Sequence, residues 1–290
     1  MTARYFTLHT KKSDFYAILS DDGSISVGGK IKGCVFISPI KKNRIAVLER
    51  LSYDTRCNIN GDLPRSHGTV AMIKAALEFA FYIHPNLKEI HLQDHSHVEC
   101  GDTSLLLGPL YITIYGKTWY EQKFGAILMD RNASLLVEGY IEHVQTKPDW
   151  KKLWSFIEPT VVAEERSAIS KTIKEWWKKT GSFRDMIKGI KENNQCDLFV
   201  EWLHAYFTYY ARLTISNQRY IIHRYIGDTI EVEPTEITNP YIQSLSMRQS
   251  KQKEKNTDVF MHFIPRRGGG TRYTFGKGAT FSELLAEGVL

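Results

Sequence analysis

The chain has 290 residues, 42% of them hydrophobic, which is enough to bury the core of one large domain or of two ordinary ones. No apolar run approaches the ~20 residues of a membrane-spanning helix. The N-terminal residues carry early charges and lack the apolar stretch of a signal peptide. We therefore expect no membrane span, and a protein of the cytosol or of a particle assembled there.

The net charge of +6 is concentrated near the C-terminal end. Residues 1–150 hold 17 Lys and Arg against 16 Asp and Glu, and residues 151–240 hold 13 against 12. Between Arg248 and Lys277, eight basic residues stand against two acidic ones. A basic tail on a neutral body indicates an arm that docks on an acidic partner, rather than a globally basic surface for nucleic acid.

Four cysteines are spread along the chain without any C-x-x-C pair; they are Cys34, Cys57, Cys100 and Cys196. This spacing is typical neither of a disulfide framework nor of a cysteine zinc site. Free cysteine is among the most frequently buried residue types. We therefore expect four reduced thiols that serve as small core residues.

The first half of the chain predicts a strand-rich fold. Segments rich in β-branched and aromatic residues, separated by turns such as Ser20–Ser24, predict an antiparallel meander. Its strands are expected at Arg4–His9, Phe15–Leu19, Ile31–Ile37 and Arg44–Tyr53. Apolar residues at helical spacing then predict a helix over Met72–Ile83, and Leu87–Leu92 follows as a strand, which completes a strand–helix–strand unit.

Further along, an apolar run covers Leu105–Tyr115 and is preceded by a polar loop. Thr118 as N-cap and Glu121 three residues later predict a capping box for a short helix over Trp119–Phe124. We expect Ser134–Val144 to form a closing strand.

From Asp149 onward the apolar spacing becomes helical, and Gly181 ends the longest pattern. Helices are expected around 150–157, at Ala163–Lys179, at Phe183–Lys191 and at Asp197–Leu213. The last of these is rich in aromatic residues, which serve either as the core of a helical subdomain or as a protein-binding face. We therefore expect an α/β domain over 1–146, a helical subdomain over 147–232 and an extended basic arm over 233–290.

The turn Arg65-Ser66-His67-Gly68-Thr69-Val70 lies where a strand leads into a helix, and such a turn can aim free backbone N–H groups at a pyrophosphate. It resembles the R/Q-x-x-G-x-G/A turn of the GNAT acetyltransferase superfamily, and Tyr120–Gly125 resembles that family's later Tyr-x-x-x-Gly-Phe segment. The resemblance implies an α+β fold with a GNAT-like mixed sheet. It also implies that Arg65, Gly68 and Thr69 bind acetyl-CoA and that Tyr120 protonates the departing thiolate.

In such an enzyme a carboxylate must take a proton from the ammonium substrate before it attacks the thioester. Glu49 or Asp54, beside the central strand, is the candidate base. Val70 stands where the family has Gly or Ala, and we expect its side chain to crowd the approach of the pyrophosphate. The preferred expectation is therefore no cofactor and no useful binding of acetyl-CoA, with acetyl-CoA as the alternative.

The ten residues 91–100 contain three histidines, two carboxylates and a thiol. They overlap the polar segment Asp94–Thr103. Imidazole and thiolate are ligands that suit zinc or copper. No second ligand cluster lies at finger-like spacing, and one segment does not easily complete a tetrahedron. A polar loop without metal is the preferred interpretation.

A second resemblance covers roughly residues 50–126. The block Leu87–Ser96, together with Leu105–Ala126 and its Gly-Lys-Thr-Trp-Tyr-Glu-x-x-Phe-Gly-Ala motif, resembles uncharacterised proteins of nucleocytoplasmic large DNA viruses. The resemblance implies a virally encoded acetyltransferase or a virion component built on an old enzyme fold.

The function we expect is that of a structural virion protein, a minor capsid protein that is assembled in the host cytoplasm and binds other capsid or virion proteins. The alternative is an acyl-CoA-dependent N-acetyltransferase, and nucleic acid is a further, less supported partner. The arm would bind neighbouring subunits through apolar anchors and arginines. These partner-binding residues are Phe260, Phe263, Tyr273, Phe275, Arg266, Arg267 and Arg272.

Overall fold

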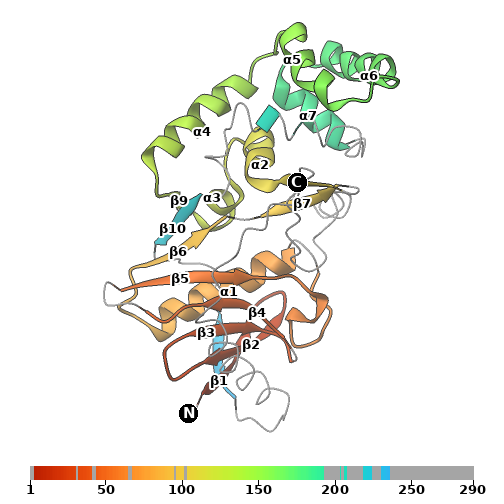
Figure 1. Ribbon diagram of the computed structural model, residues 1–290. Coiled ribbons are helices and arrows are strands. Elements are labelled where there is room, and N and C mark those ends of the chain that lie inside the picture. Colours follow the sequence, from red (N-terminus) through yellow and green to blue (C-terminus); the bar gives the residue numbers. More distant parts are fainter. Residues whose placement is uncertain are drawn as a thin grey trace, which may run out of the picture. The chain divides into compact units, whose positions relative to one another are not determined.

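The computed structural model describes residues 3–30, 32–40, 44–64, 67–94, 96–100, 103–192, 203, 206–207, 218–223 and 230–235 (Figure 1). The described residues form an α+β structure with a large mixed sheet and seven α-helices. They divide into two compact units, one up to Ile90 together with 230–235, and one from His91 to His223. This division falls at different places from the boundaries expected at 146 and 232.

The sheet of the first unit is an antiparallel meander, as predicted. Its strands are β1 (Arg4–His9), β2 (Asp14–Leu19), β3 (Ile25–Gly28), β4 (Gly33–Ile37) and β5 (Ile45–Leu51). β3 was not predicted, because it has only four residues and alternates isoleucine and valine with serine and glycine. A late strand, β11 (Glu231–Pro234), pairs antiparallel with the outer side of β1.

Helix α1 (His67–Ile83) packs against β2, β3 and β4 and begins five residues before the predicted start. Its buried stripe includes Met72, Ile73 and Leu77, and Phe79 contacts Phe6 of β1 with ring centroids 5.0 Å apart. The next strand, β6 (Glu89–Gln93), is the neighbour of β5. The N–H of Lys88 donates to the carbonyl of Arg44 (2.9 Å), so the two strands start together and run in parallel. The predicted strand–helix–strand unit is confirmed.

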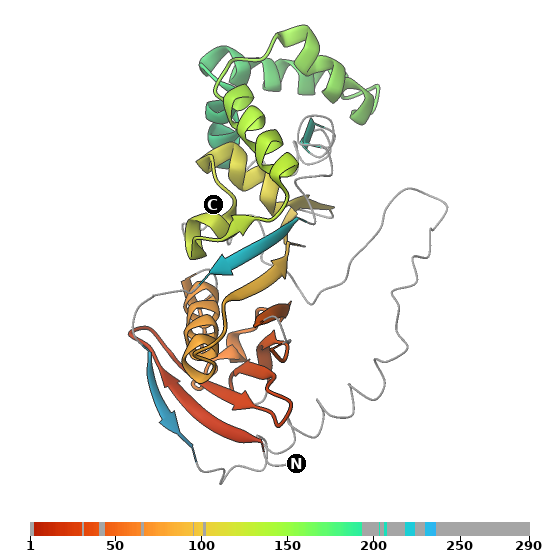
Figure 2. The ribbon, with the colours of Figure 1, turned by 90° about the vertical axis from the view of Figure 1, so that its left-hand side faces the viewer.

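In the second unit, the last residues of β6 lie beside β10 (Arg219–His223), which pairs antiparallel with β9 (Ile127–Leu128) (Figure 2). β7 (His97–Cys100) and β8 (Thr103–Leu106) form a separate antiparallel hairpin. The expectation of a polar loop over Asp94–Thr103 is therefore wrong for these strands. The apolar residues Leu105 and Leu106 end the second strand of the hairpin, and the rest of the apolar run is helical.

Among the described residues, six α-helices with defined bounds belong to the second unit. They are α2 (Leu107–Tyr115), α3 (Trp119–Phe124), α4 (Arg131–Val144), α5 (Trp150–Ile157), α6 (Arg166–Lys179) and α7 (Phe183–Glu192). The predicted capping box of α3 is confirmed, because Thr118 accepts from the N–H of Glu121 and the Glu121 carboxylate accepts from the N–H of Thr118. Two short 3-10 helices are η1 (Thr55–Cys57) and η2 (Glu158–Thr160). No helix in the described ranges is long and apolar enough to span a membrane.

The expected closing strand over Ser134–Val144 is wrong, because these residues form most of α4. The Asp130 side chain accepts from the N–H of Asn132 (2.8 Å) and starts the helix. The buried residues are Ala133, Val137, Tyr140 and Val144, whose spacing of four, three and four is helical. The buried residues thus form one face of a helix that packs against its neighbours.

The core between these helices contains hydrogen-bonded polar groups as well as apolar side chains. Tyr140 Oη lies 2.6 Å from Thr113 Oγ1, which also donates to the carbonyl of Pro109 (2.7 Å). Arg184 of α7 donates to the carbonyl of Thr113 (2.9 Å). These bonds fix α4 and α7 on α2, since a buried polar group without a partner costs ~1–3 kcal/mol.

The aromatic helix expected at Asp197–Leu213 lies mostly outside the described residues. Of its aromatic residues, Tyr206 and Phe207 are described, and both are 1% exposed. The ring of Tyr206 stacks on Phe183 at 4.2 Å, and its hydroxyl lies 2.6 Å from Nε2 of His143. These two residues therefore belong to the helical core.

Candidate functional site

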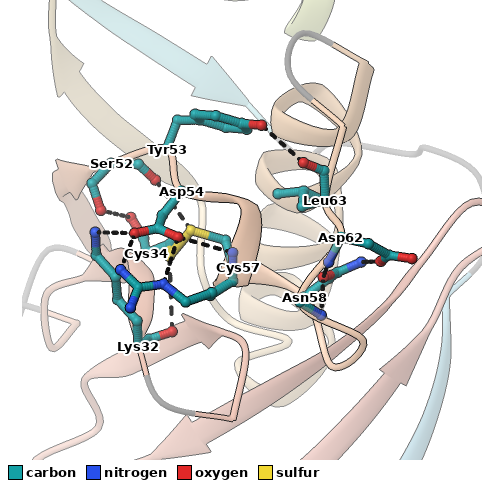
Figure 3. The surroundings of a disulfide bond; sticks show 11 residues. Lys32, Cys34, Ser52, Tyr53, Asp54, Cys57, Asn58, Asp62 and Leu63 are labelled. Carbon is teal, nitrogen blue, oxygen red and sulfur yellow. Dashed lines mark hydrogen bonds and ion pairs between the residues drawn. A yellow bond between two sulfur atoms is a disulfide. The ribbon is translucent and has the colours of Figure 1, made fainter. Parts of the chain in front are cut away.

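A disulfide joins Cys34 of β4 to Cys57 of η1, with the Cα atoms 5.8 Å apart (Figure 3). The expectation of four reduced cysteines is wrong for this pair. Both side chains are fully buried. The pairing arises because the chain after β5 folds back beside β4, where the N–H of Ser52 donates to the carbonyl of Cys34 (2.8 Å). Twenty-three positions separate the two cysteines in sequence, so no local motif reveals this contact.

Asp54, one of the two candidate bases, is held in place beside this disulfide (Figure 3). Its carboxylate accepts from Nε and Nη2 of Arg56, at 2.9 and 2.6 Å, and lies 3.4 Å from Nζ of Lys32. The hydrogen bonds from Arg56 outweigh partial burial and hold the pKa of Asp54 well below its usual range. A carboxylate with a lowered pKa is a weak base, so the geometry favours a structural role for Asp54.

The segment from Ser52 to Leu63 reaches the first turn of α1, where the expected cofactor residues lie. Tyr53 Oη donates to the carbonyl of Leu63 (2.8 Å), and the N–H of Leu63 donates to the carbonyl of Thr55 (2.8 Å). Gly68 is buried under this segment, and a Cβ placed on it would lie 2.8 Å from the Leu63 side chain. The Leu63 side chain therefore occupies the space directly beside the Cα of Gly68.

The other residues expected in an acetyltransferase site come from different parts of the chain. Thr69 is half-buried in the first turn of α1, and Glu49 is exposed on β5. Arg65 lies outside the described residues. Glu49 belongs to the first unit and Tyr120 to the second.

Tyr120, the expected acid, lies on α3 in an aromatic cluster and is 6% exposed. Its ring centroid is 5.0 Å from that of Trp119, 6.3 Å from that of Phe124 and 5.4 Å from that of Tyr220 on β10. Burial raises the pKa of Tyr120 well above its usual value, and the nearby negative charge of Asp94 raises it further. The phenol stays protonated, but neighbouring rings occupy its surroundings.

Two sets of expected residues cannot be placed. All seven partner-binding residues of the arm, 260–275, lie outside the described residues. The same holds for His95 and for the side chains of His97, Glu99 and Cys100 in the histidine-rich stretch. Among the described residues, no group of three or more His, Cys, Asp or Glu is arranged to hold a metal ion.

Three tryptophan side chains from α5 and α6 lie close together on one surface. Trp150 and Trp154 lie one turn apart on α5, with their rings nearly parallel (17°) and centroids 5.9 Å apart. The ring of Trp177 on α6 lies 5.8 Å from that of Trp150. Its Nε1 donates to the carbonyl of Pro148 (2.8 Å), which fixes the indole. All three indoles are half-buried, so part of each remains accessible.

Lysine ammonium groups lie over these rings. Nζ of Lys147 is 4.3 Å from the ring centroid of Trp177, and Nζ of Lys174 is 5.4 Å from that of Trp150. Cation–π attraction acts at these distances. The indoles are therefore the floor of a positively charged surface.

Lys174 is also the middle member of a row of exposed lysines on α6, between Lys171 and Lys178. Spacings of three and four place these side chains on one face of a helix. The tryptophan–lysine face is defined as Trp150, Trp154, Trp177, Lys147, Lys171, Lys174 and Lys178. The sequence signals for it were the pair of tryptophans four residues apart and the lysine spacing, but only the packing of α6 beside α5 brings the two together.

No protein-family model, no curated protein and no solved structure matches the chain.

Proposed function

We propose that this protein is a non-catalytic structural component of a large DNA virus particle, a minor capsid protein on a GNAT-like core. The observation that carries the proposal is the tryptophan–lysine face. Tryptophan is strongly enriched among residues that dominate binding energy. Three half-buried indoles, two of which lie under lysine ammonium groups, are suited to hold another component of the particle. The viral setting is supported by the resemblance of Leu87–Ala126.

The geometry around the candidate catalytic residues supports a binding role over an enzymatic one. Tyr120 packs in an aromatic cluster, Asp54 is fixed by Arg56, and Gly68 lies under Leu63. Each of these side chains or positions has a structural partner. A site for acyl transfer needs the acid and the base to meet a common reacting atom.

The disulfide supports the particle rather than the reducing cytosol as the place of residence. Thiols in the cytosol are kept reduced, whereas disulfides persist on virion surfaces. Cys34 and Cys57 are fully buried, so the bond is sheltered from small thiols once it has formed.

The test is to purify particles and to locate this chain by mass spectrometry, before and after stepwise removal of the outer layers. We expect it in intact particles at a fixed ratio to the major capsid protein. A variant lacking residues 245–290 should fold but stay out of particles, because the arm is proposed to bind neighbouring subunits. Absence of the full-length chain from purified particles would overturn the proposal.

An N-acetyltransferase is the second candidate, because the raised pKa of Tyr120 keeps a protonated phenol and Gly68 and Thr69 lie in the first turn of α1. Calorimetric titration with acetyl-CoA tests it, and we expect no heat of binding at micromolar concentrations. Thr69→Asp is the sharpest variant, because it adds negative charge at the turn without the clash with Leu63 that Gly68→Asp introduces. Heat in the wild type that this variant abolishes would restore the enzymatic function.

A further inference from the structure

The tryptophan–lysine face contains the two elements that proteins use to hold single-stranded nucleic acid. Such proteins combine aromatic rings, on which bases stack, with positive groups that follow the phosphates. Trp150 and Trp154 already form a near-parallel pair, which a planar base can extend. Trp177 adds a third ring at 5.8 Å from Trp150, on the neighbouring helix.

The lysine row supplies the second element. Lys171, Lys174 and Lys178 are exposed, and neighbours at this spacing have Cβ atoms about 5–6 Å apart. Each strand of B-DNA carries one phosphate charge per ~3.4 Å of helix axis, so ammonium groups spaced a few ångströms apart can contact phosphates of the same strand. Lys147 places a fourth ammonium group over Trp177.

The charged residues around the face also sum to a positive charge. Residues 147–179 contain eight Lys and Arg against five Asp and Glu. Two of the five acids have structural tasks, since Asp149 caps α5 and Glu158 lies 3.7 Å from Arg166. With eight basic and five acidic residues, the segment has a net charge of +3, which attracts a polyanion.

The choice between a nucleic acid and a protein partner follows from the kind of cation present. Lysine is depleted in the cores of protein–protein interfaces, where arginine and aromatic residues are enriched. Its ammonium group is compact and strongly hydrated, and burying it against a protein surface is costly. Among the described residues, the two cations that lie over these indoles, Lys147 and Lys174, are both lysines. Phosphates at a wet interface are the better match.

We infer that the tryptophan–lysine face binds single-stranded nucleic acid, with the indoles stacking on bases and the lysines contacting phosphates. The inference rests on the proposed function, in which this face holds another component of the particle, and it identifies that component as single-stranded nucleic acid. It assigns nucleic-acid binding to the helices rather than to the basic arm.

The experiment uses the full chain and a fluorescently labelled oligodeoxythymidylate of about 20 nucleotides, longer than the ~4–16 nucleotides of a typical single-strand site. The variant Lys171→Glu, Lys174→Glu, Lys178→Glu reverses the lysine row on exposed positions. A matched control reverses three exposed lysines of the first unit, Lys11, Lys12 and Lys88, with the same change in net charge.

The expected result is at least a tenfold loss of affinity in the row variant and a near wild-type affinity in the control. The slope of log K against log salt should fall by about 2, because each lost phosphate contact contributes ~0.7 for single strands. Tryptophan fluorescence should be quenched by the oligonucleotide, and Trp154→Leu should reduce the quenching while leaving the salt slope unchanged. Equal losses in the row variant and the control would overturn the inference, because they would reveal non-specific attraction.

Binding of polyglutamate with the same affinity as the oligonucleotide, and without base-dependent quenching, would also overturn it and point to an acidic protein partner. The result is separable from the proposed function. Location in the particle is measured by mass spectrometry on virions, whereas this inference is measured on the purified chain.

Discussion

Breaking the Cys34–Cys57 disulfide should destabilise the first unit by about 3 kcal/mol. The bond closes a loop across 23 positions, and the chain-entropy relation assigns a loop of this length a loss of about 12 cal/mol/K in the unfolded state. The variant Cys34→Ala, Cys57→Ala is preferable to serine, because both side chains are fully buried and a hydroxyl would need a partner.

Urea unfolding with and without a reductant measures the effect. With a slope of about 1–3 kcal/mol per molar urea, the midpoint should fall by roughly 1–3 M on reduction. The double alanine variant should start near the lower midpoint and not respond to reductant. The variant Cys100→Ala, Cys196→Ala is the matched control and should keep the full response.

A thiol titration of the unfolded, non-reduced protein tests independently whether Cys34 and Cys57 form a disulfide. Finding all four cysteines as free thiols would refute the reasoning, as would identical unfolding curves with and without reductant.

Two further predictions concern the helical unit. Gly189→Ala on α7 should destabilise this unit by about 1–3 kcal/mol, because the new Cβ would lie 2.6 Å from the Trp176 ring. Gly139→Ala on α4 should stabilise it by about 0.5–1 kcal/mol, because the new Cβ would have no atom within 4 Å. Thermal unfolding of both variants measures the two changes. Burial lowers the pKa of His143 below 6.5, so the folded state favours the neutral imidazole, and stability should be lost as pH falls below that value. His143→Gln should remove this loss, and an unchanged acid response in the variant would contradict the assignment.

The parts of the fold that the sequence predicted correctly are those set by local rules. The strand–helix–strand unit around α1 follows from apolar periodicity, and the capping box of Thr118 and Glu121 is a contact between residues three apart. A strand was expected over Ser134–Val144, whereas the helical spacing of Ala133, Val137, Tyr140 and Val144 matches the buried face of α4. Propensity is a weak guide where packing against a neighbour decides.

The candidate sites were harder to foresee, since they depend on contacts between distant segments. The pairing of Cys34 with Cys57 requires the chain after β5 to fold back beside β4. The tryptophan–lysine face requires α6 to pack beside α5, which places Lys174 over Trp150. In both cases the residues were visible in the sequence, and their partners were not.

The disulfide and the candidate cofactor turn are linked by the same stretch of chain. Cys57 anchors the Ser52–Leu63 segment to β4, and Leu63 at the end of that segment covers Gly68. Access to Gly68 from the side covered by Leu63 would require Leu63 to move away, which the disulfide opposes. The reduced protein is consequently the form in which acetyl-CoA has the best opportunity to bind. A titration that fails for the reduced chain as well as for the oxidised one therefore weighs most strongly against the enzymatic function.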